Sequence, residues 1–473
     1  MTTHRSTESS ESIREGDNDY DHQQSQDYDP IVLRLLNSNS FIIKLSQLRY
    51  ITFTIVGIAL LWPWNCFLSA SAYYGERFSH SPSLIKVYSS TMMSVSTITS
   101  ILYSYYLSQA QAGVNYKFRL SLGLWLTIFV FLFMSITCIS DLLIMMNDNA
   151  FFTILMIMVF ISALATCLAQ NGTMAIVNVL GGIYANAVMV GQAVAGVLPA
   201  LALIISILLV GDKKTNSTDE NYHVEKNYGV FVYYITASLI SIVSLLMIFW
   251  INHHKVESTY RSLNQLIEEQ PLNSSEIIDE PDIKQKTHVP FSVLWSKLKL
   301  IVSTIFITFS VTLIFPVFAS TVESVNTESK FWFYKKEIFI PFIYLIWNLG
   351  DLLGRIFCGY PKLHMLITNP KTLIIYSIAR LIFIPLFLTC NIHPYSAANQ
   401  SSALINSDSW YIILQLLFGI SNGQLCTSCF MIVANFCDTD EEKEAAGGFT
   451  AVFLSVGLAA GSIFSYLLVF IID

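Results

Sequence analysis

The most constraining feature of this sequence is a series of apolar stretches, each about 20 residues long and nearly free of charged side chains. A helix of that length rises about 30 Å, which matches the hydrocarbon thickness of a bilayer. Of the 473 residues, 53% are hydrophobic and only 12% are charged, which is about half the charge of an ordinary soluble domain. We therefore expect an all-α polytopic membrane protein and not a soluble enzyme.

Eleven windows have the length and the low polarity of a membrane-spanning helix. They are residues 50–73, 86–108, 118–140, 151–179, 184–210, 229–252, 296–320, 338–361, 371–391, 408–434 and 445–471. The largest polar interruption follows the sixth window and separates six helices from five. The expected regions are a disordered acidic cytosolic tail (1–48), an N-terminal bundle (49–252), a cytosolic linker (253–295) and a C-terminal bundle (296–473).

The orientation follows from the basic residues, because loops rich in Lys and Arg are retained in the cytosol. With the N-terminus inside, fourteen basic residues near the spans fall on the cytosolic side and eight on the other side. The C-terminus is then lumenal or extracellular. Asn216 and Asn399 begin sequons in outer loops and are candidates for glycosylation. The sequence predicts no cofactor, no metal site and, since it has no basic stripe, no nucleic-acid partner.

Three charged side chains lie within the predicted spans, namely Asp351, Arg355 and Arg380. A charge near the bilayer centre costs about 2.5–3.5 kcal/mol on insertion scales, so each of them needs a cavity or a partner. Asp351 and Arg355 are four residues apart, which puts opposite charges on one helical face together with Asn348. This face either contacts a solute in the interior or forms a structural ion pair with a neighbouring helix. Arg380 has no carboxylate on its own helix and is expected in a structural or gating position.

Several spans also carry uncharged polar groups whose burial requires partners. Pro63 weakens the first helix just before Trp64 and Asn65, while Gln170 lies in the fourth helix and Asn422 in the tenth. Small residues, including Gly191, recur every four positions in the fifth helix and favour close helix packing. A path lined by amides and aromatic rings suits a neutral polar solute with a flat ring better than an inorganic ion.

These polar residues stand in motifs that resemble the equilibrative nucleoside transporter family over all eleven spans. The matching segments are W-P-W-N, A-Q-N-G, G-Q-A-V-A-G-V-L-P, W-N-L-G-D-L-L-G-R, A-R-L-I-F-I-P-L, F-G-I-S-N-G and A-A-G-G-F-T-A-V-F-L-S-V-G-L-A-A-G, in that order. W-P-W-N and V-T-L-I-F-P-V-F-A-S are similar to fungal members associated with the vacuolar membrane. The resemblance implies a six-plus-five fold related to the major facilitator transporters, with the solute between the two bundles.

The resemblance also implies roles for individual residues. Gln170 would bind the nucleobase, and Asp351 with Arg355 would hold the ribose hydroxyls. The implied substrate-binding residues are Trp64, Asn65, Leu68, Met92, Gln170, Asn348, Asp351 and Arg355. The implied gating or structural residues are Arg380, Gly191, Gly196 and Asn422. A departure from animal members is Asn171, which replaces a small residue and puts inhibitor sensitivity in doubt.

The sequence thus predicts a monomeric transporter that equilibrates nucleosides such as uridine and adenosine, and also nucleobases, by alternating access. The vacuolar membrane is the expected location and the plasma membrane the alternative. A proton-coupled symporter of nucleosides or another polar solute is a rival hypothesis, as is a solute sensor without flux. A rival of a different class, an intramembrane enzyme, would need a second carboxylate or a nucleophile with a base inside the spans, which the sequence lacks.

Overall fold

The structure is a computed structural model that describes residues 31–34, 42–210, 226–269, 288–326, 331–392 and 403–472. The chain divides into two compact units. The first unit comprises Met1–Ile51 and Ile248–Ile277, and the second comprises Thr52–Met247 and Ile278–Asp473. Asn216 and Asn399, the two glycosylation candidates, lie outside the described residues.

The structure describes parts of the expected N-terminal tail and linker. Within residues 1–48, strand β1 (Ile31–Arg34) pairs antiparallel with β2 (Ile42–Lys44), and helix α2 begins at Leu45. The paired segments are rich in Ile, Val and Leu, in contrast to the Ser, Asp and Glu that precede them. Within the expected linker, α9 (Tyr228–Glu269) continues through residues 253–269. The disorder expected for the tail and the flexibility expected for the linker stay predictions.

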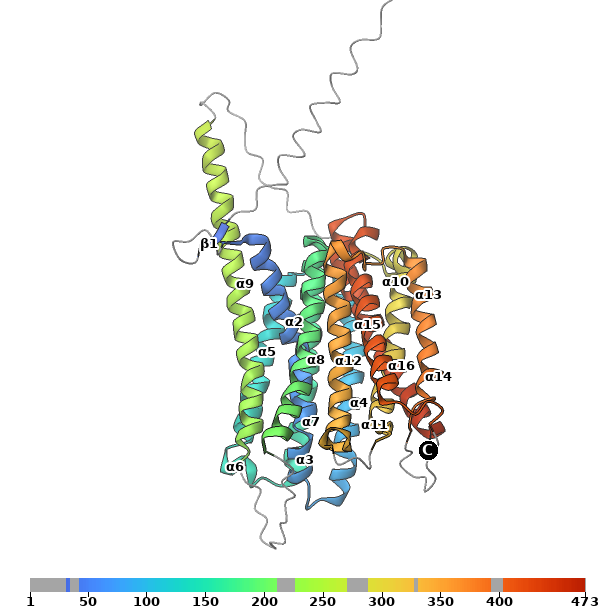
Figure 1. Ribbon diagram of the computed structural model, residues 1–473. Coiled ribbons are helices and arrows are strands. Elements are labelled where there is room, and N and C mark those ends of the chain that lie inside the picture. The colour runs from blue at the N-terminus through green and yellow to red at the C-terminus, as the bar shows by residue number, and fades with distance from the viewer. Residues whose placement is uncertain are drawn as a thin grey trace, which may run out of the picture. The chain divides into compact units, whose positions relative to one another are not determined.

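The second unit contains eleven long helical segments that run side by side (Figure 1). They include most of α2 (Leu45–Ser69) and residues 228–247 of α9. The others are α4 (Pro82–Gln109), α5 (Tyr116–Thr137), α7 (Asp148–Leu180), α8 (Gly182–Val210), α10 (Phe291–Thr312), α12 (Lys336–Gly359), α13 (Pro370–Ala379), α15 (Asp408–Ile432) and α16 (Asp440–Ile472). The short segments are α3 (Ser71–Arg77), α6 (Asp141–Ile144), α11 (Phe315–Thr321), α14 (Phe383–Phe387), η1 (Trp332–Tyr334), η2 (Pro361–Leu363), η3 (Arg380–Ile382) and η4 (Val433–Phe436).

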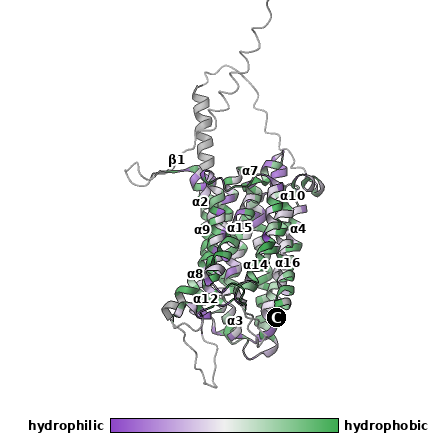
Figure 2. Cartoon of the chain, turned by 45° about the vertical axis from the view of Figure 1, so that its right-hand side comes forward, coloured by the Kyte–Doolittle hydropathy of each residue, from purple (hydrophilic) through white to green (hydrophobic). Residues whose placement is uncertain are grey.

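Within the described residues, ten helical segments are long and apolar enough to cross a membrane. The eleventh, α4, has 28 residues but is rich in Ser and Thr, which lowers its hydropathy. Figure 2 shows hydrophobic colours over much of the helices, with polar positions interspersed among them. The eleven predicted spans therefore correspond one to one with the long helical segments.

Two predicted spans are broken where the sequence places a proline. The seventh span divides into α10 and α11 next to Pro316, and the ninth divides into α13, η3 and α14 ahead of Pro385. Each proline lacks the N–H that would continue the ladder of hydrogen bonds from i to i−4. By contrast, α2 continues through Pro63 without a break.

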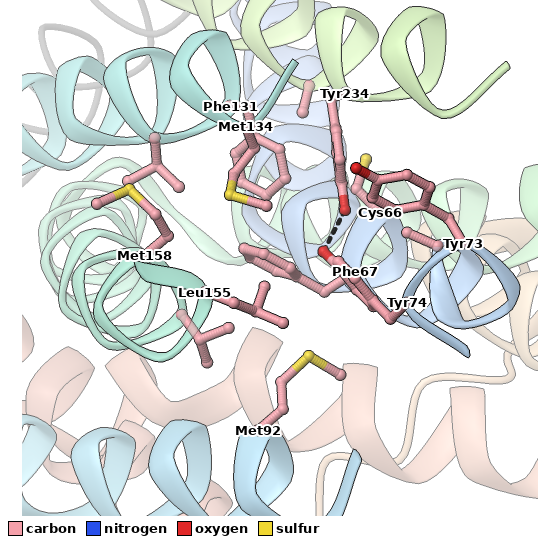
Figure 3. Packing of buried hydrophobic residues seen from close by; sticks show 14 of the residues in the cluster. Cys66, Phe67, Tyr73, Tyr74, Met92, Phe131, Met134, Leu155, Met158 and Tyr234 are labelled. Atoms are coloured by element: carbon pink, nitrogen blue, oxygen red, sulfur yellow. Dashed lines mark hydrogen bonds between the residues drawn. The ribbon is translucent and has the colours of Figure 1, made fainter. Parts of the chain in front are cut away.

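Among the described residues, the two larger hydrophobic clusters divide the helices into six and five. The first core draws on α2, α3, α4, α5, α7, α8 and α9, and includes Phe67, Phe131 and Tyr234 (Figure 3). Inside it, the hydroxyl groups of Tyr74 and Tyr234 are hydrogen-bonded to each other. The second core draws on α10, α11, α12, α14 and α15, with the end of α16 packed against it. We call these two groups of helices the N-terminal and the C-terminal bundle.

Candidate functional site

The ion pair predicted on α12 forms in the structure. Arg355 Nη2 lies 2.9 Å from Asp351 Oδ2, one helical turn away. Both residues are buried, with 4% of Asp351 and 7% of Arg355 exposed. In this conformation the pair bonds to neighbouring helices, as the structural alternative requires, and does not face an open chamber.

Glycines bring the backbone of α15 into contact with α12 beside this pair. A Cβ atom at Gly423 would lie 2.0 Å from the carbonyl oxygen of Asp351, and one at Gly354 would lie 2.3 Å from that of Ile420. A Cβ at Gly419 would lie 2.3 Å from the carbonyl oxygen of Trp347. Helices can approach this closely only where both lack side chains at the crossing. The repeated glycines of the two helices therefore fix α15 against the charged face of α12.

Asn422 uses this close approach to contact Asp351. Its Nδ2 donates a hydrogen bond to Asp351 Oδ1 at 2.7 Å, while its Oδ1 accepts one from Thr312 Oγ1 at 2.5 Å. An ionised carboxylate can only accept, so it selects the N–H end of the amide, while the one proton of the Thr312 hydroxyl also has the carbonyl oxygen of Thr308 within 2.6 Å. Asn422, expected in a gating or structural role, is thus the second polar partner of Asp351.

Arg355 connects the C-terminal bundle to the N-terminal bundle. Its Nη1 donates to the carbonyl oxygen of Met189 on α8 at 2.8 Å. In return, Asn186 Nδ2, also on α8, donates to the carbonyl oxygen of Arg355 at 2.7 Å. These bonds hold α12 and α8 together at the level of the ion pair.

Arg380 is buried in the C-terminal bundle with 1% of its surface exposed. Its Nε donates to Ser421 Oγ at 3.0 Å and its Nη1 to the carbonyl oxygen of Thr308 at 3.2 Å. The guanidinium carbon lies 4.6 Å from the centre of the Phe418 ring. Among the described residues no carboxylate forms an ion pair with Arg380.

Gln170 on α7 meets a second glutamine on α8. Gln192 Nε2 donates to Gln170 Oε1 at 3.1 Å. Gln170 Nε2 is buried and has no hydrogen-bond partner among the described residues. We did not single out Gln192 or Asn186 from the sequence. Both could have been identified from the sequence, because each is an amide within an apolar span, and the same criterion identified Gln170.

The three substrate-binding residues predicted on α2 differ in their contacts and exposure. Asn65 Nδ2 donates to the carbonyl oxygen of Ala195 on α8 at 2.7 Å. Trp64 is half-buried, and Leu68, one turn further along, is 39% exposed. The structure thus connects Asn65 directly to α8 and leaves Trp64 and Leu68 more accessible.

The two glycines predicted on α8 lie at helix crossings. A Cβ at Gly191 would lie 2.0 Å from the carbonyl oxygen of Thr54 on α2, and one at Gly196 would lie 2.6 Å from Asn348 Oδ1 on α12. Asn348 Nδ2 donates to the carbonyl oxygen of Tyr344 at 2.7 Å, within its own helix. Gly191 therefore packs α8 within its bundle, whereas Gly196 packs it against the other bundle.

Two further residues take part in packing within the N-terminal bundle. Met92 is 1% exposed and points into the first hydrophobic core beside Leu155 (Figure 3). Asn171, the departure from animal members, accepts a hydrogen bond at Oδ1 from Arg119 Nη1 at 2.7 Å. Both side chains are occupied by neighbours in this conformation.

One short stretch of α8 gathers the candidate residues from three other helices. Between Met189 and Gly196, α8 contacts Arg355 and Asn348 of α12, Gln170 of α7 and Asn65 of α2. Seven residue steps of helix span about 10 Å. Four of the eight predicted substrate-binding residues therefore contact one stretch of α8, and they come from both bundles.

Several side chains of this region retain buried donors without partners among the described residues. They are Gln170 Nε2, Trp347 Nε1, Arg355 Nε and Arg380 Nη2. An unpaired buried donor costs about 1–3 kcal/mol. The indole of Trp347 is stacked on Phe315, with ring centroids 4.3 Å apart and planes 14° apart. The region thus holds four buried donors that have no acceptor among the described residues in this conformation.

The two bundles contact each other where α7 ends and α8 begins, against the end of α15 and the start of α16. A Cβ at Gly182 would lie 2.4 Å from the carbonyl oxygen of Met431, and Asn178 Nδ2 donates to that of Lys443 at 3.0 Å. Exposure also decreases along one face of α4. Ser90 is exposed, whereas Ser108, eighteen residues later, is buried against α16 near Gly448. Eighteen residues are five full helical turns, so both serines point the same way. The interface is therefore closed at the Ser108 end and more accessible at the Ser90 end.

The fold is similar to solved transporters of the major facilitator superfamily. The transporter FucP in its outward conformation matches with a TM-score of 0.54 at 12% identity, over 88% of this chain and 91% of that chain. The proton:xylose symporter XylE matches with a TM-score of 0.52 at 11% identity, over 89% of each chain. These matches show the fold alone. The fold and its long apolar helices define a polytopic membrane protein of this architecture.

The sequence comparisons define the family. The family model described as nucleoside transporter matches residues 155–470. The nucleoside transporter FUN26 of Saccharomyces cerevisiae is 37% identical over 465 residues, which cover 91% of this chain and 86% of the relative. The equilibrative nucleoside transporter 1 of Homo sapiens is 25% identical over 472 residues, which cover 88% of this chain and 96% of the relative. The chain belongs to the nucleoside transporter family, whose members listed above are transporters and not enzymes.

Proposed function

We propose that this protein equilibrates nucleosides across a membrane by alternating access, with uridine and adenosine as substrates and nucleobases as further candidates. The observation that carries the proposal is the convergence of Asn65, Gln170, Asn348 and Arg355 on one stretch of α8 at the boundary between the bundles. A nucleoside has a flat base with acceptor atoms and a sugar with hydroxyl groups. The unpaired donors and the carboxylate of this region complement both parts.

The ion pair on α12 is proposed to hold the ribose. Asp351 Oδ1 and Oδ2 already bond to Asn422 and Arg355, and a carboxylate accepts further hydrogen bonds from hydroxyl groups. Arg355 Nε is a buried donor available for a hydroxyl oxygen. A deoxyribose would leave one of these groups unpaired, which favours ribose.

Alternating access requires the bonds between α8 and α12 to break and reform. In this conformation Arg355 donates to the Met189 carbonyl, and Asn186 donates to the Arg355 carbonyl. A solute that binds Arg355 competes with the Met189 carbonyl for the same guanidinium. Binding would thereby weaken the contact between the bundles and favour the opposite opening.

Uptake by the purified protein in liposomes tests the function. We expect radiolabelled uridine and adenosine to enter, and Asp351→Asn and Arg355→Ala each to abolish uptake while the protein stays folded in the membrane. Arg355→Lys keeps the charge but not the fork of donors, and should retain only part of the activity.

A matched control is the exposed ion pair between Lys226 and Asp141, whose charged atoms lie 3.0 Å apart. Lys226→Ala and Asp141→Asn remove charges of the same kind away from the site and should leave uptake unchanged. Normal uptake by a folded Asp351→Asn or Arg355→Ala protein would refute the assigned role.

Proton coupling is the alternative mechanism. Both oxygens of the Asp351 carboxylate are already engaged in this conformation, Oδ2 by Arg355 and Oδ1 by Asn422. We therefore expect uridine uptake in liposomes to be insensitive to an imposed pH gradient. Accumulation above the external concentration under a gradient would identify a symporter, and binding without flux would identify a sensor.

The protein is an integral multi-pass membrane protein, and we propose that it resides in the vacuolar membrane with its N-terminus in the cytosol. The basis is the sequence similarity to fungal members and the distribution of Lys and Arg between the two sides. A fluorescent fusion distinguishes the vacuolar membrane from the plasma membrane. Protease protection of tags at the two ends tests the orientation.

A further inference from the structure

This inference rests on the proposed function and concerns how Gln170 recognises the base. A glutamine amide has an acceptor end and a donor end, which differ little in shape. Which end meets a ligand depends on what holds the other end. In this protein the acceptor Oε1 of Gln170 is occupied by Gln192 Nε2 at 3.1 Å, and the donor Nε2 is buried without a partner among the described residues.

The backbone that carries Gln192 is closely packed on both sides. One residue before it, Gly191 lies against the backbone of Thr54 on α2. Three residues after it, the carbonyl oxygen of Ala195 accepts from Asn65. Three residues before it, the carbonyl oxygen of Met189 accepts from Arg355. Gln192 is therefore presented to Gln170 from a well-anchored turn of α8.

We propose that Gln192 is a positioning residue that determines base specificity by fixing the Gln170 amide with its N–H group toward the solute. Gln170 then binds a base through an acceptor atom, such as an exocyclic carbonyl oxygen. A base that presents an amino group at this point places donor against donor. The resulting preference is for a carbonyl at position 4 of a pyrimidine or position 6 of a purine.

Two substitutions of Gln192 separate positioning from packing. Gln192→Lys can only donate, so it keeps the bond to Gln170 Oε1 and the orientation of the amide. Gln192→Glu can only accept when ionised, so it bonds to Gln170 Nε2 and turns Oε1 toward the solute. Glutamate matches glutamine in length, and lysine is longer by one bond. Because a charge inside a span is costly, each variant is first checked for folding in the membrane, and uptake is compared only between folded proteins.

The measurement is the kcat and KM of uptake into liposomes for uridine and cytidine, which differ in the group at position 4, and for inosine and adenosine, which differ at position 6. We expect Gln192→Glu to lower the ratio of kcat/KM for uridine over cytidine by about tenfold, chiefly through KM, as one favourable hydrogen bond is exchanged for an unfavourable contact. Gln192→Lys should keep the ratio of the unaltered protein. The ratio of kcat/KM for inosine over adenosine should fall in Gln192→Glu as well.

A purely structural role of Gln192 would change stability or overall rate in both variants and leave the ratio constant. Equal ratios in folded Gln192→Glu and Gln192→Lys proteins would overturn the inference. Gln170→Ala distinguishes this failure from a failure of the proposed function. If Gln170→Ala leaves KM unchanged for every nucleoside, the assigned base contact is wrong; if it raises KM while both Gln192 variants keep the ratio, only the role of Gln192 is wrong.

Discussion

At the scale of single residues, Asp351 depends on partners that lie far away in the sequence. Asn422 donates to Asp351 Oδ1, and the Thr312 hydroxyl lies 2.5 Å from the oxygen of the same amide. Asn422→Leu has similar bulk but removes the donor, which leaves one oxygen of a buried carboxylate unpaired. We expect kcat/KM for uridine to fall about tenfold or more, since such a loss costs about 1–3 kcal/mol. Uptake kinetics in liposomes provide the measurement.

A control on the same helix is Thr427, whose Oγ1 is buried without a partner among the described residues. Thr427→Val keeps the shape and removes a hydroxyl that forms no bond, so both uptake and stability should be retained or slightly improved. If Asn422→Leu behaved like Thr427→Val, Asn422 would not support Asp351.

At the scale of helices, the crossing of α12 and α15 places this carboxylate beside its partners. Gly423→Ala would put a Cβ 2.0 Å from the carbonyl oxygen of Asp351 and 3.0 Å from the nitrogen of Arg355. Because backbone atoms cannot turn away, the helices must separate, at a cost of about 1–3 kcal/mol. We expect a lower melting temperature in detergent and a loss of nucleoside uptake.

Gly75 in α3 is the matched control, because a Cβ there meets nothing within 4 Å. Alanine is favoured over glycine within a helix by about 1 kcal/mol. Gly75→Ala should therefore melt at the same temperature or higher and transport normally. A Gly423→Ala protein with unchanged stability would show that the crossing tolerates a wider spacing than this structure has.

At the scale of the whole transporter, all eight cysteines are buried. Burial raises the pKa of Cys437, in the connection before α16, to about 11. Thiol reagents attack the thiolate, so the unaltered protein should label slowly at neutral pH. An introduced cysteine can then report access to one position without removal of the native ones.

Ser90→Cys and Ser108→Cys test alternating access on one face of α4. Ser90 is exposed and Ser108 is buried against the other bundle. In the conformation seen here, Ser90→Cys should react with a maleimide about tenfold faster than Ser108→Cys. Saturating uridine should slow labelling of Ser90→Cys and accelerate that of Ser108→Cys. Equal rates that do not respond to uridine would contradict movement of the bundles at this interface.

Much of the fold could be predicted from the sequence, because the length and polarity of a membrane helix are local properties. The eleven windows correspond to the long helical segments, and the polar interruption after the sixth window separates two hydrophobic cores. The sequence also identified the i, i+4 ion pair of Asp351 and Arg355, which a single helix is enough to define. The sequence analysis did not predict the short elements β1 and β2 or the extension of α9 beyond its span.

Only the tertiary structure decided which buried polar groups meet. Arg355 and Met189 are 166 residues apart, and Asn422 and Asp351 are 71 residues apart, so no local pattern could pair them. The central role of α8 was missed for the same reason, because its glycines indicated close packing but not the helices that pack there. Hydrophobic length fixes each span by itself, whereas a buried hydrogen bond depends on the direction of two side chains brought together by the packing of different helices.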